Sequence, residues 1–186
     1  MYTQKDFSHL LGMEGFSDTM LNNHFTLYKG YVDNSNKMIE NLDKVEKATQ
    51  EYYELKRRLG WEINGIKLHE LYFGNLVKGG SVMGDKVKEA LSNSYGSIEE
   101  WENSIKRNGT IRGIGWVVLI QDNDTGKIFH EWVGEHNIGN IINADILLVM
   151  DMWEHAFITD YQLKKADYIT AFMKNIDWSV VEGRMK

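Results

Sequence analysis

The chain is organised around two adjoining stretches, the apolar run 144–150 (Ala-Asp-Ile-Leu-Leu-Val-Met) and the stretch 151–157 (Asp-Met-Trp-Glu-His-Ala-Phe) that follows it directly. The length and branched residues of the first stretch predict a buried strand, so Asp151 lies where the strand leaves the core and a helical turn begins. His155 lies on the same face of that turn, with the two β-carbons about 5 to 6 Å apart. Such a pair can hold a metal ion. Alternatively, Asp151 caps the helix and His155 forms an ion pair with it, and these residues alone leave both interpretations open.

The composition narrows the chemistry available to such a site. With 186 residues, 42% of them hydrophobic, the chain suffices for one large domain or two smaller ones that share a core. It has no cysteine, so any metal would be held by nitrogen and oxygen ligands. A net charge of −6 without a basic block argues against nucleic acid or an anionic membrane as the main partner. Because we see no secretory leader and no apolar run of about 18 residues, we expect a cytoplasmic protein.

The first part of the chain is predicted to be helical. Residues 1–14 show little periodicity and are expected to lie as an arm over the helices, which are predicted over 20–41, 41–60 and from 61 or 65 to 77. The stretch 16–18 (Phe-Ser-Asp) offers an N-cap for the first helix, and Gly60 is expected to end the second. The linker at 78–81 (Lys-Gly-Gly-Ser) is the candidate boundary between an N-terminal helical domain, residues 1–78, and a C-terminal α/β domain, residues 82–186.

The second part mixes helices with a small sheet. The expected elements are helices over 84–94 and 98–108, strands over 116–121, 127–133 and 146–150, and helices over 160–175 and 178–184. The turn at 122–126 (Asp-Asn-Asp-Thr-Gly) predicts a hairpin, with Gly126 where a positive φ is needed. The sequence therefore predicts an α+β fold, in which an N-terminal long-helix hairpin precedes a three-stranded antiparallel sheet surrounded by helices.

Histidines also occur on the predicted N-terminal helices. His24, Tyr28 and Tyr31 follow one another at spacings of four and three, so they share one helical face. His69 and Phe73 share a face in the same way. Such stripes are typical of ordinary core packing as well as of a site, and the spacing alone does not distinguish the two.

Three stretches carry a resemblance to one family. Stretch 151–157 resembles the Asp-x-Trp-Glu-His-Ala-Tyr signature of the iron/manganese superoxide dismutases, with Phe157 in place of the last Tyr. Stretches 68–76 (Leu-His-Glu-Leu-Tyr-Phe-Gly-Asn-Leu) and 23–32 (Asn-His-Phe-Thr-Leu-Tyr-Lys-Gly-Tyr-Val) resemble the segments that supply the other two ligands in this family. The resemblance runs from about residue 18 to the end. The ligands it implies are His24, His69, Asp151 and His155.

The first ligand segment departs from the family pattern. Family members commonly have eight residues from the ligand His to a gateway Tyr, whereas His24 and Tyr31 are seven apart, and an ungapped alignment puts Asn23 at the ligand position. We assign His24, because a helix without a π-bulge keeps residues i and i+7 on one face.

The resemblance also implies the chemistry. It predicts one iron or manganese ion per subunit, held by three imidazoles and a carboxylate with a fifth position open, and disproportionation of superoxide to dioxygen and hydrogen peroxide. The implied catalytic residues around the ion are Tyr31 and His136. The implied surrounding residues are Tyr28, Tyr72, Phe73, Trp116, Trp153 and Glu154. Glu154 would reach His155 of the partner subunit, so a homodimer or homotetramer is expected.

Several positions depart from the family further. Gly65 stands where iron-type members bring a Gln, so His136 is expected to contact the bound solvent in a manganese-type geometry. Tyr28 and Ile158 replace the His and Tyr that join two subunits in the family, and Phe157 lacks a hydroxyl. These changes keep an alternative open, a non-enzymatic protein of the same fold with an impaired or absent metal site. A non-haem iron oxygenase is disfavoured, because it would leave two positions open rather than one.

Overall fold

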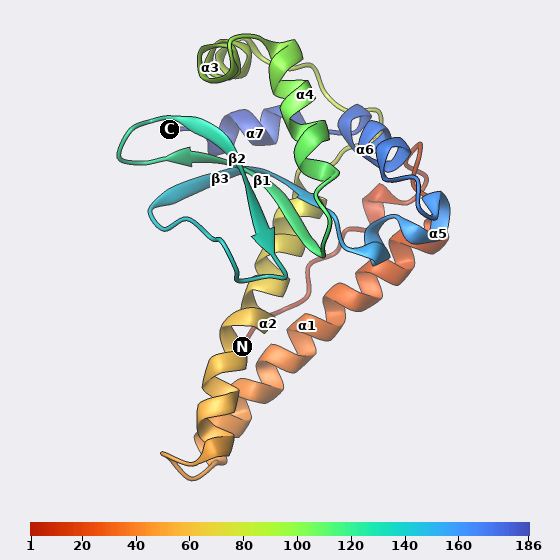
Figure 1. The fold of residues 1–186 in the computed structure, drawn as a ribbon. Helices are drawn as coiled ribbons and strands as arrows, with labels where there is room; N and C mark the ends of the chain where they lie inside the picture. Colours follow the sequence, from red (N-terminus) through yellow and green to blue (C-terminus); the bar gives the residue numbers. More distant parts are fainter.

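The computed structural model describes all residues, 1–186. After an N-terminal arm, the chain forms a hairpin of two long helices. Helix α1 spans Asp18–Lys44 and helix α2 spans Gln50–Gly74, and they lie side by side (Figure 1). The Ser17 hydroxyl caps α1 by accepting the Met20 N–H at 3.0 Å, as predicted. Thr49 caps α2 in the same way.

The predicted helix boundaries in this hairpin are wrong at two points. Gly60 does not end a helix but lies inside α2, on an exposed face. A glycine in a helix costs about 1 kcal/mol of stability relative to alanine, and packing of the following turns of α2 outweighs that cost. The break lies earlier instead, at residues 45–49, which were expected to be helical. Ala48 turns the chain there with φ of 63°, so neither glycine nor proline marks the turn in the sequence.

The three predicted strands form one antiparallel sheet. They are β1 (Gly115–Asp122), β2 (Ile128–Gly134) and β3 (Ala144–Asp151), in the order β2-β1-β3. Gly126 takes φ of 71° in the β1–β2 turn, as its position predicted. In the central strand Trp116 pairs with Val133 on one side and with Asp151 on the other, so the end of β3 lies beside the start of β1.

Five shorter helices complete the predicted α+β fold (Figure 1). They are α3 (Asp85–Tyr95), α4 (Ile98–Gly109), α5 (Ile158–Tyr161), α6 (Lys165–Lys174) and α7 (Trp178–Arg184), with 3-10 turns η1 (Ser8–Leu10) and η2 (Glu154–Ala156). The single helix predicted over 160–175 is in fact two, because Gln162 adopts φ of 53° and interrupts it. None of the helices has the length and apolar character that crossing a bilayer requires.

One hydrophobic core joins the helical hairpin to the sheet. Asn75, just beyond α2, is fully buried and pairs with the edge strand β3: its Oδ1 accepts the Val149 N–H at 2.9 Å and its Nδ2 donates to the Val149 carbonyl at 3.3 Å. The N-terminal residues lie across α1 as expected, where the Lys5 N–H donates to the Tyr28 hydroxyl at 3.1 Å. The division into domains at residues 78–82 stays a prediction.

Candidate metal centre

Four side chains from four separate elements converge where the hairpin meets the sheet. They are His24 of α1, His69 of α2, Asp151 at the end of β3 and His155 of η2. One ligand atom from each lies within 4.8 Å of all the others. These are the four residues that the sequence resemblance implied.

The carboxylate of Asp151 lies at the middle of this cluster. Its Oδ2 is 3.2 Å from Nε2 of His24 and 3.1 Å from Nε2 of His155. Nε2 of His69 is 3.8 Å away. Three imidazole nitrogens thus face one carboxylate oxygen.

Local hydrogen bonds aim these groups at one another. His69 donates from Nδ1 to the Gly65 carbonyl at 2.6 Å, because a carbonyl can only accept, and this leaves the Nε2 lone pair directed at the cluster. The other carboxylate oxygen of Asp151, Oδ1, accepts the Trp153 N–H at 2.8 Å. Asp151 therefore sits at the end of a strand, as predicted, but it bonds the backbone two residues on rather than capping η2.

Burial gives these groups the protonation states that metal binding needs. His24, His69 and Asp151 are nearly inaccessible to solvent, whereas the His155 side chain is a quarter exposed. Burial lowers the pKa of His24 and of His69, so both imidazoles are neutral. Burial alone would raise the pKa of Asp151, but the imidazoles of His155 and His24 outweigh it and hold that pKa below its usual range.

The geometry of helix α1 determines which residue of stretch 23–32, Asn23 or His24, faces the cluster. It is α-helical throughout, without a π-bulge, so His24 and Tyr31 share its inner face. His24 is only 2% exposed, whereas Asn23 points to solvent. The structure thus brings His24, and not Asn23, to the cluster.

The donor set fits a first-row transition ion. Nε2 of His24 and Nε2 of His69 are buried without a hydrogen-bond partner, which is costly unless something outside the chain satisfies them. Three imidazoles with one carboxylate are typical ligands of iron and manganese in proteins, and no thiolate competes.

A hydrogen-bonded chain of three side chains adjoins the cluster. The Trp116 indole, which can only donate, gives its N–H to Nδ1 of His136 at 3.0 Å, and Nε2 of His136 lies 2.9 Å from the Tyr31 hydroxyl. Nε2 therefore carries the His136 proton and donates it to Tyr31. Burial lowers the pKa of His136 to about 4, and burial together with Asp151 raises the pKa of Tyr31, so both are neutral near pH 7.

Aromatic rings named by the resemblance surround the cluster. The rings of Tyr72 and Phe73 lie 5.3 and 4.8 Å from that of His24, and the Trp116 ring lies 5.0 Å from that of His69. Trp153 stacks on His155 at 5.8 Å.

The polar groups of the other two implied residues point away from the four clustered side chains, although the Tyr28 ring stacks on that of His69 at 6.3 Å. The Tyr28 hydroxyl donates to Oε1 of Glu70 at 3.0 Å, beneath the N-terminal arm. Glu154 is exposed, and its carboxylate makes no hydrogen bond or ion pair within the chain, whereas its carbonyl accepts the Phe157 N–H at 3.1 Å. Within one chain, therefore, neither residue contacts the four clustered side chains through its polar group.

Sequence reasoning missed several residues that contact the site. Tyr168 of α6 donates to the Asp151 carbonyl at 2.8 Å and lies 3.1 Å from the Tyr72 hydroxyl. Trp61 of α2 lies with its ring 4.4 Å from that of His136, and Asn64 donates to the His136 carbonyl at 2.9 Å. No local pattern marks them, although the spacing of eight residues between Trp61 and His69 places these two on neighbouring faces of α2.

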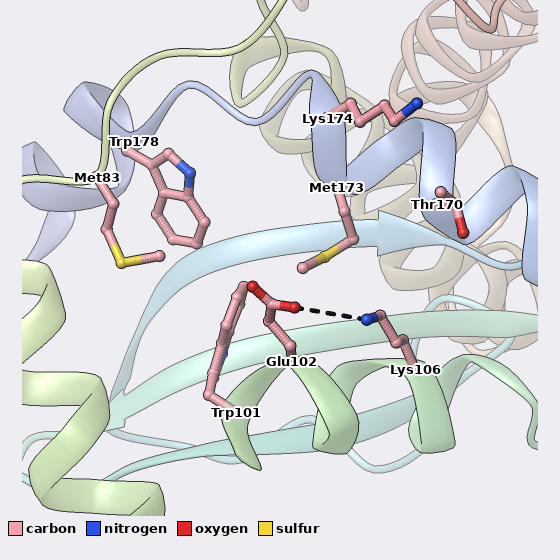
Figure 2. A pocket seen from close by; sticks show the side chains of 8 residues that line it. All are labelled: Met83, Trp101, Glu102, Lys106, Thr170, Met173, Lys174 and Trp178. Carbon is pink, nitrogen blue, oxygen red and sulfur yellow. Dashed lines mark hydrogen bonds and ion pairs between the residues drawn. The ribbon is translucent and has the colours of Figure 1, made fainter. Parts of the chain in front are cut away.

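A separate surface pocket of about 330 Å³ lies away from this centre, between α4, α6 and α7 (Figure 2). Trp101, Met173 and Trp178 form its walls, and an ion pair between Glu102 and Lys106, 3.5 Å apart, lies beside it. None of the four clustered side chains lines it.

Comparison with known proteins points to one family. The sequence profile described as "Iron/manganese superoxide dismutases, C-terminal domain" matches residues 83–184. A superoxide dismutase (Fe) of Aquifex aeolicus is 34% identical, with 98% of this chain and 90% of that protein covered. Proteins of the same name from Cupriavidus metallidurans and Sulfolobus acidocaldarius are 32% and 31% identical, over 89% and 91% of this chain and 86% and 83% of theirs.

Proposed function

Since the chain belongs to the iron/manganese superoxide dismutase family, we propose that it disproportionates superoxide, using one iron or manganese ion per subunit. Two superoxide ions and two protons give one dioxygen and one hydrogen peroxide. The observation that carries the proposal is the buried cluster of three imidazoles and a carboxylate, in which Nε2 of His24 and Nε2 of His69 have no hydrogen-bond partner. One-electron exchange with superoxide is the chemistry that the bound ion supplies.

The proposed ligands are Nε2 of the three histidines and Oδ2 of the aspartate, that is, His24, His69, His155 and Asp151. Their geometry before binding is favourable, because Gly65 and Trp153 already fix the His69 ring and the Asp151 carboxylate. Little reorganisation of these two ligands is then needed when the ion enters.

The proposed catalytic residues supply and hold protons. Because Trp116 donates to His136 and His136 donates to Tyr31, the Tyr31 hydroxyl hydrogen is free for another acceptor. The raised pKa of Tyr31 keeps that proton in place at neutral pH. We propose that this hydroxyl donates toward the reduced oxygen species and is reprotonated from solvent.

The aromatic wall limits what reaches the centre. Tyr72, Phe73 and Trp116 are fully buried against the clustered histidines, and His155 is the only one of the four proposed ligands with appreciable exposure. This favours a small substrate and keeps bulk water out of a site where charges interact strongly.

We propose a homodimer or homotetramer located in the cytoplasm. The support for assembly is the exposed surface around His155: the Glu154 carboxylate has no partner in its own chain, and the side chains of Ile158 and Leu163, nearby in sequence, are 46% and 88% exposed. A glutamate adjacent to a histidine along the chain cannot easily bond it within one turn, so a carboxylate from a second subunit fits better. Sedimentation of the purified protein would test this, and a monomer at micromolar concentration would contradict it.

The proposed function predicts that metal and activity depend on the same side chain. We expect about one iron or manganese per chain in the purified protein, rapid removal of superoxide, and loss of both in His69→Ala. His130→Ala is the matched control, because His130 is also largely buried but lies outside the cluster. Metal near zero in the parent protein, or activity unchanged in His69→Ala, would contradict the proposal and favour a non-enzymatic protein of this fold.

A further inference from the structure

His136 occupies the tip of a very tight turn. Gly134 and Ile138 close this turn through two backbone hydrogen bonds, of 2.7 and 3.1 Å, and His136 lies between them with no exposed surface. Its ring makes only the two hydrogen bonds described above, one to Trp116 and one to Tyr31. The direction of the ring therefore depends on the backbone of the turn.

The residue before His136 has an unusual backbone. Glu135 adopts φ of 49°, in the left-handed region that non-glycine residues rarely occupy. Three contacts hold it: its N–H donates to the Ile114 carbonyl at 3.0 Å, its carbonyl accepts the Trp153 indole N–H at 3.4 Å, and its Oε2 accepts the Trp61 indole N–H at 2.8 Å. A strained conformation persists only where its surroundings fix it in this way.

Trp61 connects this turn to helix α2. Besides its bond to Glu135, its ring lies 4.4 Å from the His136 ring. The guanidinium of Arg58 covers the Trp61 ring at 3.4 Å and lies 3.3 Å from the Glu62 carboxylate, so the indole is held from outside as well. Helix α2 also carries His69, and Trp61 therefore places His136 relative to the same helix that places a proposed ligand.

We propose that Trp61 and Glu135 are positioning residues for His136. The Trp61 N–H holds the Glu135 carboxylate, the carboxylate keeps the left-handed backbone at residue 135, and this backbone aims the His136 ring at the Tyr31 hydroxyl. Neither residue touches the four clustered side chains, so both act through the His136–Tyr31 pair, and the Trp61 ring lies 4.4 Å from that of His136 and 5.6 Å from that of Tyr31. The inference rests on the proposed function of His136.

The kinetic test uses variants that remove one side of the Trp61–Glu135 bond at a time. Trp61→Phe keeps an aromatic ring but loses the donor, and Glu135→Ala loses the acceptor, whereas Glu135→Gln keeps an acceptor oxygen. We expect kcat to fall about 10- to 100-fold in the first two, with KM changed less and metal content unchanged. We expect their losses to be non-additive in the double variant, and Glu135→Gln to stay within about twofold of the parent.

Glu131→Ala provides a matched control. Glu131 is a carboxylate on β2, the strand that leads into this turn, and it accepts the Ile141 N–H at 3.2 Å without contacting His136. We expect Glu131→Ala to keep the kcat of the parent protein. Equal losses of kcat in Glu131→Ala and Glu135→Ala would overturn the proposal, because they would show a general effect on the loop.

A second readout does not depend on activity. In protein loaded with zinc, which is redox-inert and diamagnetic, the Trp116 indole proton reports directly on its bond to His136. We expect this resonance to move upfield in Trp61→Phe and Glu135→Ala and to stay in place in Glu131→Ala. An unchanged resonance in both would overturn the proposal, even if the parent protein proved to have no superoxide dismutase activity.

Discussion

His24→Ala and Asn23→Ala should affect metal binding very differently. His24 supplies one of the four proposed ligand atoms and is buried, whereas Asn23, the neighbour that an ungapped family alignment would select, is exposed. Structural zinc sites with four ligands bind their ion with about 10–16 kcal/mol, and on that scale an equal share for one ligand is about 2.5–4 kcal/mol. That corresponds to about 100- to 1,000-fold weaker binding in His24→Ala.

The two substitutions also differ in their effect on folding. Removing the His24 ring leaves a hole between Tyr72 and Phe73, which should lower the free energy of unfolding of the metal-free protein by about 2–5 kcal/mol. Asn23→Ala should change it by less than about 0.5 kcal/mol.

The assay is metal content by elemental analysis after equilibration with a competing chelator, and urea unfolding of the metal-free proteins. Metal retained in His24→Ala but lost in Asn23→Ala would refute the assignment of the first ligand. So would equal retention in both variants.

Three further predictions concern stability, pH and packing. Asn75→Ala should cost about 2–4 kcal/mol in urea unfolding, because it leaves the buried Val149 N–H without an acceptor; a cost below about 0.5 kcal/mol would contradict this pairing. Burial lowers the pKa of His130 from 6.5 to about 3. Between these two pH values the unfolded chain binds a proton that the folded chain does not, so the free energy of unfolding falls as pH falls from 6.5 toward 3, by about 2 kcal/mol at pH 5. His130→Gln should therefore show a shallower fall in unfolding free energy between pH 6.5 and 5, and parallel curves would argue against a buried neutral His130. In Gly65→Ala the new Cβ would lie 2.6 Å from the Tyr31 ring, so we expect about 1–3 kcal/mol of destabilisation and a lower kcat, and a variant matching the parent in both would show that the ring has room to move.

The sequence predicted the sheet well because local signals agree there. Alternation, branched residues and the Gly126 turn all indicate the same three strands, and their bounds are correct to within two residues. In the helices the signals conflict. Gly60 looks like a stop but lies within α2, and Ala48 looks helical but turns the chain, because packing between α1 and α2 outweighs local preference at both positions.

The four clustered side chains could be found in the sequence only through the family resemblance. Spacing alone put His24 on a helical face with Tyr28 and Tyr31, but it does not say which face of the helix packs against α2. The exposure of Asn23 and the burial of His24 in the structure answer that question. Trp61, Glu135 and Tyr168 could not be predicted at all. Their contacts join residues between 17 and 75 positions apart, and no local periodicity records such distances.

Reconstitution of the metal-free protein tests the central claim most directly. The protein is stripped with a chelator and titrated with iron or manganese, and superoxide removal is measured against bound metal per chain. The proposed function predicts that activity returns in proportion to bound metal and stops rising at one ion per chain. Saturated metal binding without any superoxide removal, or activity that is independent of bound metal, would contradict it.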